Sequence, residues 1–200
     1  MVPQTRGLTL PSSGLACGQP LKSNVRRLKS HFAATMFKQA YSSLLSQLEE
    51  MPAFLQRSAV ALPTELQLRE PEKDNMPLVE YLWHVRDCDS DLYALRIRRV
   101  LQEDKPYLDP VNVGVWPESR NYRSRKGDLA ISEFVELRAG LVRELREVNQ
   151  EALARTGVRA DGSEINVLGL IEQLAEHDRD HRWRVAAILR GFGWPAQTGA

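Results

Sequence analysis

The stretch LGLIEQLAEHDRDHRWRVAAIL, residues 168–189, decides the fold of this protein. Its apolar residues recur every three or four positions, the spacing that keeps one face of an α-helix against a protein core. His177 and His181 fall on that face. Side chains four residues apart on a helix are neighbours, with Cβ atoms about 5–6 Å apart. The stretch therefore predicts a buried helix that presents two imidazoles to one point.

A second stretch, LVEYLWHVRDCDSDLYALRIRRVL at residues 78–101, adds a third histidine. Burying a polar group without a partner costs on the order of 1–3 kcal/mol, so three converging imidazoles favour a shared metal ion. A lone inward histidine is more often a core residue bonded to a carbonyl, and the prediction of a metal site rests on the three together. The same periodicity predicts an inner face made of Tyr81, His84, Cys88, Leu92 and Leu95.

The rest of the chain is also helical in pattern, with almost no strand signal. The expected helices cover residues 34–51, where Pro52 interrupts, with a short continuation to 62, then 76–103, 128 to before 157, and 166–191. Four helices predict an all-α fold, an antiparallel or crossed four-helix bundle spanning residues 34–194 with a flexible tail at 195–200. The long connection 104–127 carries prolines and aromatics, and either plugs one end of the bundle or forms a lid over a substrate pocket.

The N-terminal residues differ in composition from the rest. The first 48 residues contain no Asp or Glu, and residues 1–33 are basic without sustained apolar periodicity, so we expect a disordered extension. An upstream extension with Met36 as the natural start, a targeting peptide, or an arm that contacts acidic surfaces would each explain it, and we favour the first.

Composition narrows the class of protein. The chain has 200 residues, 42% hydrophobic and 26% charged, which suits one globular domain. The net charge of +1 gives no reason to expect nucleic acid as a partner of the folded domain, and no apolar stretch is long enough to span a membrane. Cys17 and Cys88 are far apart, which argues against a disulfide framework and favours a cytoplasmic location.

Several residues near the histidines could shape the site. Carboxylates there could accept an imidazole N–H and orient the ring, and the candidates are Glu80, Asp87, Asp178 and Asp180. Arg138 lies on the inner face of the third helix, where its stem either extends to the surface or its guanidinium binds an anionic substrate group. Cys88 is either a small core residue or an additional ligand or redox-sensitive thiol, and a fourth ligand would close the site.

The chain from about Met36 to Arg190 resembles the DinB-like superfamily of metal-dependent proteins. The resemblance is carried by WHVRDCDSDLYALRIRRVL (83–101), DPVNVGVW (109–116), FVELRAGLVRELREV (134–148) and AEHDRDHRWRVAAIL (175–189). It implies a four-helix bundle that holds one divalent ion, commonly zinc or nickel, with one histidine from the second helix and two from the fourth. Carried over by motif position, the ligands are His84, His177 and His181.

The resemblance leaves the chemistry open, because the superfamily includes thiol-dependent S-transferases and a thiol-dependent isomerase. Three neutral histidines leave a coordination position open, which is typical of a catalytic metal site. We expect an enzyme that acts on a small molecule and activates a low-molecular-weight thiol as cosubstrate, with hydrolysis as the second choice. The alternative is a non-enzymatic, metal-stabilised bundle acting as a stress-related binding or scaffold protein. A homodimer is compatible with a bundle of this size.

Overall fold

The computed structural model describes the backbone of residues 20–71 and 76–194, and the side chains of residues 31–71 and 76–194. Residues 1–40 and 41–200 form two compact units. The described part of the first unit is helical and belongs to α1 (Pro20–Ala61). Residues 20–33 are thus helical where we expected disorder: proline is harmless in a first helical turn, and leucine, lysine and arginine are good helix formers. Residues 1–19, with Cys17, and the tail 195–200 lie outside the described residues.

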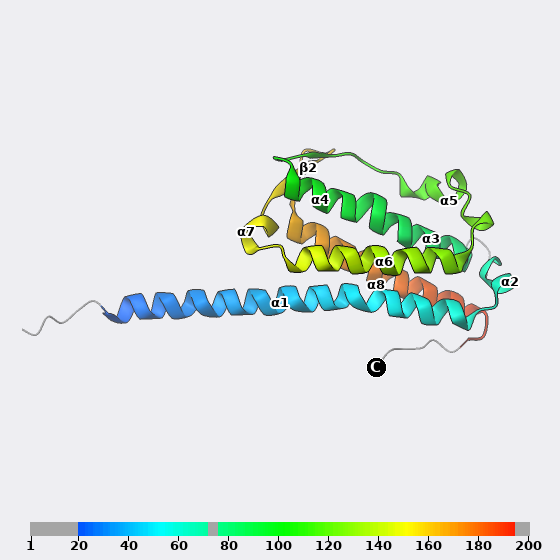
Figure 1. Ribbon diagram of the computed structural model, residues 1–200, viewed down its shortest axis with the longest axis horizontal. Coiled ribbons are helices and arrows are strands. Elements are labelled where there is room, and N and C mark those ends of the chain that lie inside the picture. The colour runs from blue at the N-terminus through cyan, green and yellow to red at the C-terminus, as the bar shows by residue number, and fades with distance from the viewer. Residues whose placement is uncertain (1–19, 72–75, 195–200) are drawn as a thin grey trace, which may run out of the picture. The chain divides into compact units, whose positions relative to one another are not determined.

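Four helical segments of the second unit lie side by side (Figure 1), which confirms the predicted four-helix bundle. They are α1 from Tyr41 onward, the composite helix of α3 (Leu78–Cys88), η1 (Asp89–Ala94) and α4 (Leu95–Gln102), then α6 (Gly127–Arg146) and α8 (Val167–Gly191). The composite helix packs against α6 and α8. Two short helices, α2 (Thr64–Gln67) and α7 (Gln150–Leu153), lie in the connections. No helix among the described residues is long and apolar enough to cross a membrane.

Pro52 lies inside α1, where we expected it to interrupt the helix. Proline has no N–H to donate to the carbonyl four residues earlier, which here belongs to Leu48. That carbonyl accepts a hydrogen bond from Nη1 of Arg138 at 3.0 Å instead. The neighbouring Met51 and Leu55 are fully buried, so core packing and the replacement donor together let the helix continue through the proline.

The composite helix contains a π-helical segment, η1, which changes its phase. A π turn holds more residues than an α turn, so the residues after it rotate relative to those before it. Leu95, expected on the inner face, is 51% exposed, and Ile97 and Val100 are buried in its place. The prediction for the second half of this helix was therefore wrong in phase, although the helix itself was correctly placed.

A small three-stranded sheet was not predicted. Its order is β1 (Tyr107–Leu108), β2 (Thr156–Arg159) and β3 (Glu164–Asn166), with β1 parallel and β3 antiparallel to β2. A Cβ at Gly157 would lie 2.9 Å from Cγ2 of Val100, so glycine lets β2 approach the end of α4 closely.

The connection 104–127 also holds η2 (Val113–Val115), α5 (Trp116–Ser119) and η3 (Tyr122–Ser124). Trp116 and Tyr122 are buried within the main apolar core cluster, and the rings of Tyr122 and Trp83 are stacked at 6.5 Å. These contacts support the interpretation of the connection as a hydrophobic plug.

Candidate metal centre

Three histidines meet between α3 and α8. His84 comes from α3, and His177 and His181 come from one face of α8, whose start is capped by Asn166 accepting from the Gly169 N–H at 2.8 Å. One nitrogen from each imidazole lies within 4.8 Å of the other two. The ring centroids of His177 and His181 are 4.3 Å apart, and His84 is 4.9 Å from His181. The three residues singled out in the sequence therefore come together.

Three ring nitrogens of the cluster are buried and have no hydrogen-bond partner among the described residues. Both ring nitrogens of His177 and Nδ1 of His181 are buried without a hydrogen bond, an arrangement that is costly unless something else binds them. Burial, together with the other histidines, lowers the pKa of His177 to about 2 and that of His181 to about 3, and burial also lowers that of His84. Neutral imidazoles are the form that binds metal, so these residues fit a divalent ion.

Two tyrosines flank the cluster. The Tyr81 ring meets His181 edge-on at 5.6 Å, and the Tyr93 ring lies 5.2 Å from His177. Tyr93 belongs to the π segment, and burial raises the pKa of its phenol to about 12. Tyr81 was expected on the inner face, but Tyr93 was missed because α-helical spacing places it opposite His84. Only the change of phase in η1 brings it beside His177.

Cys88 lies one turn after His84, with Sγ 3.5 Å from Nε2 of that histidine. The thiol is 1% exposed, and burial with the nearby charge of Asp87 raises its pKa to about 12. Among the described residues, the group able to share one metal ion consists of the three histidines without Cys88. This arrangement supports Cys88 as a core residue and leaves the metal site open.

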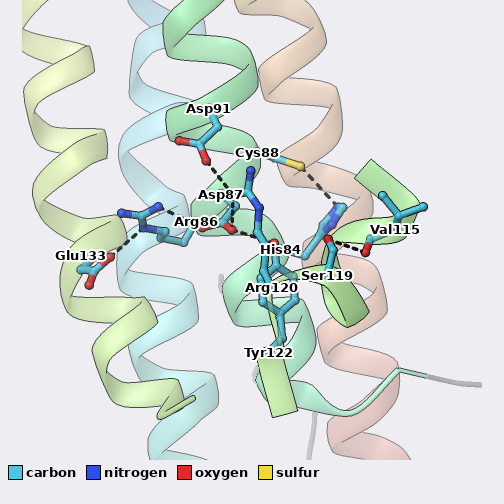
Figure 2. A network of polar contacts seen from close by, with 10 residues as sticks. All are labelled: His84, Arg86, Asp87, Cys88, Asp91, Val115, Ser119, Arg120, Tyr122 and Glu133. Carbon is cyan, nitrogen blue, oxygen red and sulfur yellow. Dashed lines mark hydrogen bonds and ion pairs between the residues drawn. The ribbon is translucent and has the colours of Figure 1, made fainter. Parts of the chain in front are cut away.

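Asp87 and Glu80 are engaged by cations rather than imidazoles. Asp87 is 1% exposed and accepts hydrogen bonds from Arg86 at 2.9 Å, from Tyr122 at 2.8 Å and from Arg120. Figure 2 shows this network alongside the His84–Cys88 contact. Glu80 pairs with Arg123 of η3. Within the described chain neither carboxylate accepts from a histidine, so both attach the connection 104–127 to α3 instead.

Asp180 is exposed on α8. No contact joins it to a histidine of the described residues, in contrast to the role beside the ligands that we expected. Its place on the helix explains the difference, because it lies three residues after His177 and one before His181, and the inner face at this level is taken by the two histidines and Asp178.

Arg138 is the centre of a buried ion cluster. It is 1% exposed, so the expectation that its stem reaches the surface was wrong, and its guanidinium is already occupied. Nη2 donates to Asp89 at 2.7 Å and to Asp178 at 3.0 Å, and Nη1 donates to Asp178 as well as to the Leu48 carbonyl. Burial alone would lower the pKa of Arg138, but the two carboxylates raise it above its usual value. The cluster connects α1, η1, α6 and α8 immediately beside His177.

Asp89 was missed in the sequence, where it stood among several acids of one helix. The available signal was Arg138 itself, because an arginine on an inner face needs a buried carboxylate partner. Asp178, proposed as an acceptor for an imidazole, serves Arg138 instead.

Comparison with known proteins agrees with this architecture. A model of the DinB superfamily matches residues 47–185. The Bacillus subtilis (strain 168) protein named "Putative metal-dependent hydrolase YfiT" is 26% identical over 162 residues, which cover 78% of this chain and 88% of that protein. A solved YfiT structure, described as a four-helix bundle of unusual topology, matches with a TM-score of 0.73 at 18% identity, covering 78% of this chain and 90% of the other.

Proposed function

Because this chain belongs to the DinB superfamily, we propose that it is a metal-dependent enzyme whose divalent ion is held by His84, His177 and His181. The observation that carries the proposal is the cluster itself, with one nitrogen of each imidazole within 4.8 Å of the others and three buried ring nitrogens that no described residue bonds. A purely structural histidine cluster would be expected to bond these nitrogens internally.

The donor set suits zinc or nickel, since imidazole is a preferred ligand of both. When bound, such an ion supplies Lewis-acid activation of a water or of a thiol at its open position. The chain holds the imidazoles neutral and aims them at one point. The Arg138 ion cluster fixes α8 against the π segment, and so holds His177 and Tyr93 side by side.

Hydrolysis is the reaction we favour. Its support is the name of the matched Bacillus subtilis protein, "Putative metal-dependent hydrolase YfiT". The Cys88 thiol is buried with a raised pKa and is not a ready nucleophile, so in either candidate reaction the attacking group would come from outside the chain. The resemblance to thiol-dependent transferases supports the second candidate, transfer of an external thiol to an electrophile. A bundle whose metal only stabilises the fold is expected to have four protein ligands. Among the described residues the group that could hold the ion has three, which disfavours the scaffold alternative.

Metal analysis of tag-free protein purified without chelators tests the proposal. We expect about one zinc or nickel ion per chain in the wild type, and loss of that ion in the His177→Ala, His181→Ala double variant. His31→Ala is the matched control, because His31 is exposed on α1. Negligible metal in the wild type after incubation with zinc and nickel would refute the metal site. Ester, amide and thiol-acceptor panels, with and without chelator, then separate hydrolysis from thiol transfer.

A further inference from the structure

A small pocket lies next to the histidine cluster. Its volume is about 200 Å³, and its lining includes Pro71, Tyr81, Trp183, Arg184 and Ile188. Tyr81 stands one turn before His84 on α3, and Arg184 stands one turn after His181 on α8. The Tyr81 ring both lines the pocket and contacts His181. The pocket therefore adjoins the histidine cluster through Tyr81.

Arg184 is an exposed cation in the lining of this pocket, and it has no partner among residues 31–71 and 76–194. Its neighbour Arg182 pairs with Glu50 at 3.0 Å, but Arg184 has no ion pair or hydrogen bond within the described part of the chain. A guanidinium that no described side chain occupies can bind a carboxylate through two parallel hydrogen bonds.

The other walls are apolar or aromatic. Trp183 is 68% exposed, which is unusual for so large an apolar side chain, and it lines the pocket together with Tyr81 and Ile188. An exposed tryptophan beside a cation offers a ligand both an aromatic face and a positive charge. The volume suits a small molecule, and one arginine suits a single carboxylate better than a phosphate dianion.

We propose that this pocket binds the carboxylate of a small acid with an apolar body, and that Arg184 selects it as the substrate class of the enzyme. That the bound acid is a substrate rests on the proposed function. That the pocket binds a carboxylate rests only on the residues that line it. An acid anchored by Arg184 and packed on Trp183 is held beside the histidines. Arg184 then determines specificity, while the histidines hold the ion.

Calorimetric titration with benzoate and with its neutral counterpart benzamide tests this assignment. We expect the wild type to bind benzoate about tenfold more tightly than benzamide, the scale of one charge-assisted interaction. Arg184→Gln should abolish that preference, and Trp183→Ala should weaken both probes. Arg190→Gln, an exposed arginine of the same helix outside this pocket, is the control and should keep the preference. Circular dichroism and metal content should be unchanged in all three variants.

The titrations are repeated after chelation to separate the two proposals. A benzoate preference that persists without metal and requires Arg184 supports the pocket, even if metal analysis refutes the metal site. Equal affinities for the two probes in the wild type would overturn the pocket proposal. Benzoate binding that vanishes on chelation and ignores Arg184→Gln would also overturn it, because the carboxylate would then be binding the ion.

Discussion

Replacing Arg138 with leucine should be among the most damaging single changes in the bundle. The substitution keeps an apolar side chain in the core but leaves the carboxylates of Asp89 and Asp178 buried without a cation, at 1% and 4% exposure. Breaking a buried ion pair by removing one partner costs about 3–5 kcal/mol. The Leu48 carbonyl also loses its donor, and Pro52 cannot replace it. The free energy of unfolding should therefore fall by at least about 3 kcal/mol.

Two companion variants make the reasoning specific. Neutralising both acids in the triple variant Asp89→Asn, Arg138→Leu, Asp178→Asn should recover part of the loss, because no buried charge then remains unpaired. Adding Pro52→Ala to Arg138→Leu restores an N–H opposite the Leu48 carbonyl and should recover about 1 kcal/mol, the net value of one hydrogen bond. The two effects act on different groups and should be close to additive.

Urea unfolding followed by circular dichroism, in chelator at pH 7.5, measures these differences. Burial already raises the pKa of Asp178 in the wild type, although Arg138 partly opposes the shift. Without Arg138 the pKa of Asp178 rises further. As the pH falls through that pKa the carboxylate is protonated, and the cost of its buried charge disappears. The difference in free energy of unfolding between Arg138→Leu and the wild type should therefore be smaller at pH 5.5 than at pH 7.5. A loss below about 1 kcal/mol for Arg138→Leu, or a triple variant no more stable than the single one, would refute the reasoning.

The remaining predictions concern the histidine cluster. In metal-free protein the folded pKa values of about 2 for His177 and about 3 for His181 lie below the ordinary value of 6.5, so the unfolded chain binds more protons between these limits. The contribution of the two neutral histidines to the free energy of unfolding should be complete above pH 6.5. It should fall by up to about 1.4 kcal/mol per histidine between pH 7.5 and 5.5. Urea unfolding of the His177→Ala, His181→Ala variant with the same dependence on pH as the wild type would contradict the assignment. Cys88→Ser should keep about one metal ion per chain, because Sγ lies outside the ligand group, and metal analysis showing a loss would make Cys88 a ligand.

The bundle and the three histidines were readable from the sequence because both depend on local periodicity. Four amphipathic helices and an i, i+4 histidine pair are patterns of neighbouring residues, and the resemblance to a family added the expected ligand set. The sheet was not predicted because its strands are only two to four residues long, and because β1 pairs with β2 across some fifty residues of chain. No local pattern of that length separates a strand from a turn.

Other features depend on contacts that a linear pattern does not contain. Pro52 looked like a helix end because the replacement donor for Leu48 comes from Arg138, ninety residues away. Leu95 was expected on the inner face and Tyr93 was not, because the α-helical period was assumed to hold throughout the composite helix. Arg138 looked able to reach the surface because its partner Asp89 was hidden among other acids.

The π segment has a further consequence for how residues can be matched between this protein and its relatives. The residues before Asp89 and those after Ala94 each follow an α-helical period, but the two periods are out of phase because the π turn of η1 lies between them. A relative that has a plain α-helix here has to be aligned with a gap inside the helix rather than in a loop. Equivalences drawn from His84 straight through to Ile97 without that gap would pair each residue of α4 with a neighbour of its true counterpart. Tyr93 would then be matched to a residue on the wrong side of the helix.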